Sequence, residues 1–300
     1  MANLNILLAE PVLLLQLLVD GLLIGAIFAV AAFGMALVWG VMNIINVAQG
    51  EFVMLGGFVA LYVAKAGLNP ILFGVPFAAL VLYGVGWLLY RSVIFRVVDR
   101  DLFISILATF GISIVLQQAA NQVFGADVRT VDAGLGSFGL WHGQIVVAWI
   151  KLLAFIMALL LGGALYLFLK VSRLGQAIRA TAQNARAARI LGVDTGRVYA
   201  ATYALNAAIC GAVGALVVMT WFTHPFLGLP YTVRSFMIVV VAGLGNLLGV
   251  LWAGLGLGVI ENLAGFLLGA EFQAAFIFGL LVVILVWRNL RLARKRMVLK

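Results

Sequence analysis

Apolar residues dominate this chain in long runs, which polar segments interrupt at only a few places. A helix that crosses the hydrocarbon core of a bilayer needs about 20 apolar residues. The runs that approach or exceed this length are 12–41, 51–66, 70–90, 102–123, 146–169, 198–221, 235–250, 251–268 and 274–290. The first is too long for a simple crossing, and 51–66 and 235–268 are short or broken by glycine. The pattern predicts an all-α polytopic membrane protein with about eight or nine transmembrane helices, some of them broken.

Composition supports this interpretation and excludes a soluble globular domain. Hydrophobic residues make up 65% of the chain and charged residues only 10%, with a mean hydropathy of +1.20. Such values lie outside the range of soluble proteins, so we expect residues 1–300 to form a single transmembrane domain. The net charge of +9 does not indicate a nucleic-acid partner, because the basic residues lie between apolar runs and at the C-terminus. The single cysteine, Cys210, lies in an apolar run, where we expect it to serve packing.

The distribution of basic residues predicts the orientation of the chain in the membrane. The loop around 91–100, the segment 170–197 and the tail 288–300 carry three, six and six of the 19 basic residues. Basic residues accumulate in cytoplasmic loops, so these three segments are predicted to be cytoplasmic. With nine spans, the N-terminus then lies on the outer side.

The segment 170–197 is the only long polar stretch, with a single acid, Asp194, against its basic residues. Between Gly175 and Gly192 lie sixteen residues rich in good helix formers, and Gly192 stands where a C-terminal cap would lie. We therefore predict one short cytoplasmic helix over 175–192. Its apolar face comprises Ala177, Ile178, Ala182, Ala185, Ala188 and Leu191, and its basic face comprises Arg179, Arg186 and Arg189. Such a helix could dock on an acidic partner, or the segment could be a loop whose arginines only hold it in the cytoplasm.

A second polar group follows the first apolar run and consists of Asn43, Asn46, Gln49 and Glu51. In a helix Asn43 and Asn46 would share a face, and Gly50 would permit a break there. The group could line a translocation path, act as a hinge or be no more than a cytoplasmic turn.

Two further carboxyl groups, Asp20 and Glu261, fall within apolar runs. Ionisable residues at membrane depth are costly and therefore suggest function, although either carboxyl could instead be packed, hydrogen-bonded or protonated.

Signatures of catalysis are missing. The sequence contains no G-x4-G-K-[ST], H-E-x2-H or G-x-S-x-G motif and no cluster of His and Cys residues. The chain therefore cannot supply a P-loop for ATP, and we expect it to be neither an enzyme nor a cofactor-binding or metal-binding protein. If transport uses ATP, another subunit must bind it.

Three segments together resemble the permease subunits of branched-chain amino acid ABC importers, the LivH type. Asp20, Gly21, Gly25 and Ala29, followed by 43–51, resemble the segment that ends in N-x-A-[HQ]-G-E. Residues 175–192 resemble the ATPase-coupling loop, and 242–249 with Gly254, Gly258 and Glu261 resemble a glycine-rich segment that ends in Glu. Two positions depart from the family pattern. Gln49 stands where many relatives have His, and residues 183–185 read Gln-Asn-Ala, without the Glu of the general Glu-Ala-Ala pattern.

The resemblance implies a subunit that works by alternating access in the bacterial inner membrane. Its implied partners are a second permease subunit, two ATPase subunits, a periplasmic solute-binding protein and a small solute. The implied ATPase-coupling residues are Gly175, Arg179, Asn184, Ala185, Arg186, Ala188, Arg189, Leu191 and Gly192. The implied residues of the translocation path are Asp20, Asn43, Asn46, Gln49, Glu51 and Glu261.

One alternative is an ion- or proton-coupled secondary transporter or channel, in which Asp20, Glu51 and Glu261 would form the ion site. A third possible class of function is a membrane-embedded enzyme, but the sequence contains no group of catalytic residues that supports it.

Overall fold

The computed structural model describes residues 7, 10–98, 100–140, 144–243, 245–269 and 272–298. Within this part of the chain, six helical segments are long and apolar enough to cross a membrane. They are Pro11–Met42, Pro70–Arg96, Leu102–Phe124, Trp149–Val171, Thr195–Thr220 and Leu247–Leu268. Two shorter apolar segments, Gly228–Ala242 and Ala275–Trp287, accompany them. The prediction of an all-α polytopic membrane protein is therefore confirmed.

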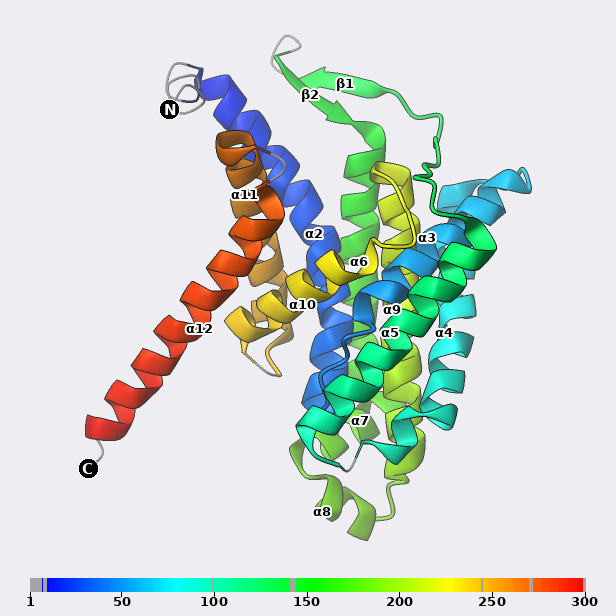
Figure 1. The fold of residues 1–300 in the computed structure, drawn as a ribbon, viewed down its shortest axis with the longest axis vertical. Helices are drawn as coiled ribbons and strands as arrows, with labels where there is room; N and C mark the ends of the chain where they lie inside the picture. The colour runs from blue at the N-terminus through cyan, green and yellow to red at the C-terminus, as the bar shows by residue number, and fades with distance from the viewer. Residues whose placement is uncertain are drawn as a thin grey trace.

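Most of the long helices run roughly along the long axis of the molecule, whereas α10 lies across it (Figure 1). The long helices are α2 (Pro11–Met42), α3 (Gln49–Lys65), α4 (Val75–Ser92), α5 (Leu102–Phe124), α6 (Trp149–Val171), α9 (Thr195–Thr220), α10 (Gly228–Ala242), α11 (Leu247–Leu268) and α12 (Gln273–Val298). The short elements are η1 (Pro70–Gly74), η2 (Ile94–Arg96), β1 (Ser137–Leu140), β2 (Ile145–Ala148), α7 (Arg173–Gln183) and α8 (Ala185–Ile190).

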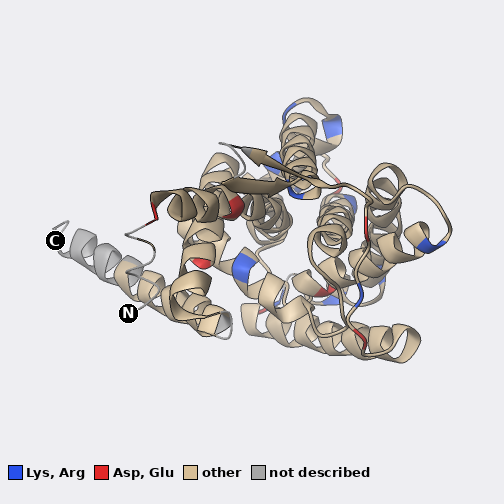
Figure 2. Cartoon of the chain, turned by 90° about the horizontal axis from the view of Figure 1, so that it is seen from above, with Lys and Arg blue, Asp and Glu red and all other residues tan. Residues whose placement is uncertain are grey.

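The basic segments gather at one end of the molecule. The α4–α5 connection and α8 lie at the lower end in Figure 1, and α12 runs toward the same end. The start of α2 and the hairpin β1–β2 lie at the opposite end. Seen from above in Figure 2, most of the helical ribbon carries no charged position. The described helices thus begin with α2 at one end of the molecule and finish with α12 toward the other.

Three boundaries differ from the sequence prediction. The chain breaks at 43–48, before Gly50, because Asn43 takes a left-handed conformation (φ 51°) and ends α2. Gly243 and Gly245 both have positive φ, so α10 ends there rather than near residue 250. Ser137–Leu140 and Ile145–Ala148 pair as an antiparallel two-stranded sheet. Its second strand occupies the start of the predicted span 146–169, so α6 begins only at Trp149.

Helices α2 and α9 form the core, and small residues let their neighbours approach closely. Buried side chains surround α2 from Gly21 to Met42 on nearly every face, as expected for a helix that is apolar all round. Gly254 of α11 lies so close to Ala29 of α2 that a Cβ on the glycine would be 2.6 Å from the alanine Cβ. Close backbone approach of this kind replaces the hydrophobic driving force that is missing within lipid.

The break at 43–48 lies within the bundle, and two threonines satisfy its backbone. Thr109 of α5 accepts a hydrogen bond from the backbone N–H of Val47 at 3.1 Å. Thr232 of α10 accepts one from Gly50 at 2.8 Å and donates one to the carbonyl of Val47 at 3.0 Å. Irregular backbone is tolerated at membrane depth only where protein supplies such partners. The segment is therefore packed and hydrogen-bonded within the protein.

The α2–α11 contact generates a prediction for Gly258. A Cβ at this position would overlap the carbonyl oxygen of Gly21 and the Cα of Gly25. We expect Gly258→Ala to force the helices apart at a cost of about 1–3 kcal/mol, which lowers the thermal midpoint and the yield. Gly256→Ala is the control, because nothing lies within 4 Å of its Cβ. Equal stability of the two variants in detergent would show that this face is not tightly packed.

The threonine contacts generate a second prediction. Thr232→Val leaves the N–H of Gly50 and the carbonyl of Val47 without partners, at about 1–3 kcal/mol for each group. We expect a lower thermal midpoint and slower transport. The control is Thr202→Val, since the buried Thr202 hydroxyl bonds only the Val198 carbonyl of its own helix. A Thr232→Val protein as stable as the control would mean that the break does not depend on this hydroxyl.

Candidate functional site

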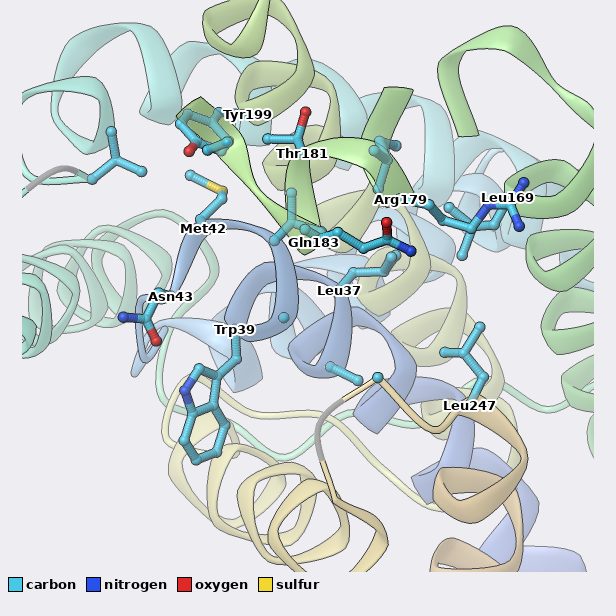
Figure 3. A pocket seen from close by; sticks show the side chains of 18 of the residues that line it. Leu37, Trp39, Met42, Asn43, Leu169, Arg179, Thr181, Gln183, Tyr199 and Leu247 are labelled. Carbon is cyan, nitrogen blue, oxygen red and sulfur yellow. The ribbon is translucent and has the colours of Figure 1, made fainter. Parts of the chain in front are cut away.

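A cavity of about 920 Å³ joins the end of α2 to the two helices of the polar segment 170–197. Figure 3 shows Arg179, Thr181 and Gln183 of α7 on one side of it, with Trp39 and Asn43 on the side of α2. The lining therefore contains one predicted path residue, Asn43, together with two predicted coupling residues, Arg179 and Ala185. Segments that lie more than 100 residues apart in the sequence share one space.

The prediction of a single helix over 175–192 is wrong. Helix α7 ends at Gln183 and α8 begins at Ala185, with Asn184 in an extended conformation between them. The Asn184 side chain accepts a hydrogen bond from the N–H of Ala187 at 3.0 Å and so caps α8. The predicted cap at Gly192 is confirmed, since its φ is +86° and it directly follows Leu191, the C-cap residue of α8.

The predicted apolar face is divided between the two sides of this segment. Ile178 and Ala188 are buried against the rest of the chain, at 1% and 3% exposure. Ile190 and Leu191, in contrast, are 80% and 83% exposed. Leu191 therefore points away from the protein's own core. The end of α8 thus presents these two large apolar side chains outward.

The remaining predicted coupling residues have distinct environments. Arg189 donates from Nε to the hydroxyl of Thr195 at 2.7 Å, so it holds α8 to the start of α9. Arg179 donates to the Lys170 carbonyl at 3.2 Å, whereas Arg186 lies exposed. Gly175 lies against the end of α6, where a Cβ would be 2.6 Å from the Cα of Leu169. A side chain at Gly175 would therefore open the α6–α7 corner.

The polar group after α2 divides into an exposed and a buried part. Asn43 is exposed and lies outside any helix, so the prediction that it shares a helix face with Asn46 is wrong. Asn46, Gln49 and Glu51 are buried, at 0%, 0% and 1% exposure. Gln49 donates to the carbonyl of Ala31 at 2.8 Å.

Each of these buried side chains meets a polar group from another helix. Gln49 Nε2 lies 3.0 Å from the Sγ of Cys210, so this cysteine contributes a polar contact as well as packing. The hydroxyl of Tyr203 donates to Asn46 at 3.3 Å. On the other side of α3, the Ser113 hydroxyl donates to Glu51 at 3.0 Å.

Several polar atoms in this region have no hydrogen-bond partner among the described residues. They are Asn46 Nδ2, Gln49 Oε1, Glu51 Oε2 and Asn206 Nδ2. Buried polar atoms without partners are rare, so these groups are available to water or to a polar solute. Asn206 is a residue that the sequence analysis missed, because a lone Asn in an apolar run has no local signature.

Asp20 and Glu261 are both held in ion pairs. Asp20 Oδ1 lies 2.8 Å from Nζ of Lys151 on α6. Glu261 accepts two hydrogen bonds from Nε of Arg234, at 2.9 and 3.0 Å. Neither pairing could be predicted, since partners that lie 131 or 27 positions apart leave no pattern in the sequence.

The three carboxyl groups of the ion-coupled alternative do not meet. Asp20 pairs with α6, Glu51 bonds with α5 and Glu261 pairs with α10. Within the described ranges, no three His, Cys, Asp or Glu residues are grouped so that they could hold a metal ion. A shared carboxylate site for a cation is therefore not formed.

Comparison with known proteins agrees with this geometry. Over residues 17–285 the chain matches the family described as branched-chain amino acid transport system, permease component. It is 29% identical to the high-affinity branched-chain amino acid transport system permease protein BraD of Pseudomonas aeruginosa, with 91% of this chain and 94% of BraD covered. It is 28% identical to the permease protein LivH of Escherichia coli K12, with 91% and 92% covered.

A more distant relative is the probable LivH permease of Methanocaldococcus jannaschii, at 27% identity with 90% of this chain and 88% of the relative covered. No solved structure gives a significant match. The family match spans nearly all of the nine apolar helices, including both helices of the polar segment and the buried break. The chain belongs to the family of branched-chain amino acid transport system permease components.

Proposed function

We propose that this chain is the permease subunit of an ATP-driven importer for a branched-chain amino acid or a related small polar solute. It works in the inner (plasma) membrane by alternating access, with a second permease subunit, two ATPase subunits and a periplasmic solute-binding protein. ATP binds to the ATPase subunits, and this chain carries no cofactor. The observation that carries the proposal is the cavity that α7 and the broken end of α2 share. A displacement of α7 changes the wall of a space that the break also lines.

The end of α8 is the surface that docks on the ATPase. Ile190 and Leu191 are apolar, nearly fully exposed and located at the end of the molecule where the basic segments gather. Burial of a leucine-sized side chain contributes about 1.5–3 kcal/mol, which exceeds the roughly 0–1 kcal/mol of an exposed ion pair. Docking therefore depends on these two residues more than on Arg186.

The translocation path follows the buried polar group. Asn43 marks its opening at the coupling end, and Asn46, Gln49 and Glu51 continue it into the bundle. Their unpartnered polar atoms can bind a polar solute or water without the desolvation cost of an apolar wall. Asp20 and Glu261 contribute as members of ion pairs. This division into pairs also favours an importer over an ion-coupled transporter, which would need carboxylates around one cation.

If the end of α8 docks on the ATPase, Leu191→Ala should have a specific effect. Because the side chain is 83% exposed, the yield of the permease should not change. Loss of its buried area in the complex should weaken ATPase binding about tenfold or more and reduce solute-stimulated hydrolysis. Arg186→Gln should have a smaller effect that depends on salt. The measurement is co-purification of the ATPase subunits and hydrolysis in reconstituted membranes.

Ala185→Asp provides a second test of docking, because Ala185 is only partly buried. Ala188→Asp does not, because Ala188 is buried and an aspartate there would disturb the permease itself. If Leu191→Ala and Ala185→Asp both keep their ATPase and full stimulation, α8 is not the coupling element.

The proposed orientation predicts accessibility to an impermeant thiol reagent. The native Cys210 is buried and should stay unlabelled, so single introduced cysteines can be measured against a low background. In intact cells Gln183→Cys should be protected and Asp132→Cys should react, since both positions are exposed and lie at opposite ends of the molecule. Labelling of Gln183→Cys from outside would reverse the orientation.

A further inference from the structure

A second cavity, of about 410 Å³, lies among α2, α10, α11 and the connection 221–227. We call it the outer site, because Trp221 follows the end of α9 that lies away from α8. Aromatic and aliphatic side chains form most of its wall, and among the described lining residues only Arg234 and Glu261 carry a charge at neutral pH. The residues that line it include Phe28, Trp221, Leu227, Tyr231, Arg234 and Glu261.

The ion pair in the outer site is buried and rigidly held. The side chains of Arg234 and Glu261 are 15% and 4% exposed. The guanidinium carbon of Arg234 lies 5.0 Å from the ring centre of Phe28 and 5.4 Å from that of Tyr231. Cation–π contacts from two rings fix the plane of the guanidinium. Its N–H groups therefore point in defined directions.

The guanidinium has more donors than Glu261 uses. Arginine carries five N–H donors in a planar fork. The hydrogen bonds to Glu261 come from Nε and Nη2, which form one edge of the fork. The edge formed by the two Nη atoms has the geometry that receives a second carboxylate in a bidentate manner.

We infer that the outer site binds the ammonium and carboxylate groups of a zwitterionic amino acid, with Arg234 receiving the carboxylate and Glu261 the ammonium. The inference rests on the function proposed above and gives that function a solute class and a binding site. The aromatic wall of Phe28 and Trp221, whose rings stack 6.5 Å apart, then receives the apolar side chain of the solute.

The net charge of the outer site is the physical reason for choosing a zwitterion as its ligand. An isolated charge at membrane depth is expensive, and removal of one partner from a buried ion pair leaves such a charge. A zwitterion aligned against the Arg234–Glu261 pair adds one positive and one negative charge beside their opposites, so the site stays neutral. A simple amine or carboxylic acid adds a single net charge. An uncharged amide or urea offers nothing that competes with the existing pair.

His224 does not alter this balance. It lines the cavity, and its Nδ1 accepts a hydrogen bond from the backbone N–H of Phe226 at 3.2 Å. Burial lowers the pKa of His224 below its ordinary value, which favours the neutral imidazole at pH 7.

Direct binding of L-leucine and L-alanine tests the inference. The complete complex with its ATPase subunits is placed in lipid nanodiscs without the solute-binding protein, so that any binding belongs to the membrane part. The competitors are 4-methylpentanoate, 3-methylbutylamine and 4-methylpentanamide. We expect the zwitterions to bind about 10- to 100-fold more tightly than each competitor, the range that one charge-assisted hydrogen bond gives.

The decisive variant is Glu261→Gln. It leaves Arg234 with a hydrogen-bond acceptor but gives the site a net positive charge. L-Leucine binding should fall about tenfold, while 4-methylpentanoate should bind more tightly than to the parent. A purely structural role of Glu261 would not reverse the preference. Arg129→Gln is the control, because it removes a positive charge from the same end of the molecule, outside the cavity.

The outcomes separate this inference from the proposed function. Unchanged L-leucine binding in an assembled Glu261→Gln complex overturns the inference. If that variant does not assemble, the double variant Arg234→Gln, Glu261→Gln restores a neutral, hydrogen-bonded pair. If the double variant still binds L-leucine more tightly than the competitors, the inference is overturned equally. A parent complex that assembles and hydrolyses ATP but binds no zwitterion overturns the outer site alone. Failure to associate with any ATPase overturns the proposed function.

Discussion

The rest of this structure depends on the satisfaction of backbone hydrogen bonds where α2 gives way to α3. Within a bilayer no water pairs with the exposed N–H and carbonyl groups of residues 43–48, so neighbouring helices must supply partners. Thr109 and Thr232 do so from α5 and α10. The break therefore fixes where those two helices lie. The start of α10 also packs against α3, where Gly228 lies against Glu51.

Glycine and alanine make this arrangement possible, because they allow backbones to touch where side chains would hold them apart. On the α2–α11 face the close contacts include Ala29 and Gly254. With the helices packed so closely, the few polar side chains have little freedom. Gln49 and Asn46 must find partners on α2 or α9, and their remaining polar atoms stay unpaired among the described residues. Tight apolar packing thus concentrates the polar groups of the interior into a narrow zone beside the break.

Sequence predicted the features that depend on local composition and failed on those that depend on tertiary contact. Fold class, the approximate helices, the grouping of basic segments and the cap at Gly192 followed from run length, charge and residue type. The single helix over 175–192 was wrong, because Asn184 favours a cap over the continuous helix that its neighbours' propensities indicate. The partners of Asp20 and Glu261 were missed, since Lys151 and Arg234 are distant in sequence. The direction in which α8 presents Leu191 also required the packed structure.

The two cavities are connected through the same pair of helices, which suits the alternating access proposed for this chain. Helix α2 contributes Trp39 to the cavity beside α7 and Phe28 to the outer site. Helix α11 contributes Leu247 to the first and Glu261 to the second. Because their glycine-rich faces leave no space between α2 and α11, we expect the two helices to move as one body. In the proposed alternating access, a tilt of that body would alter both cavities, so movement imposed on α7 at one end would reach the Arg234–Glu261 pair at the other.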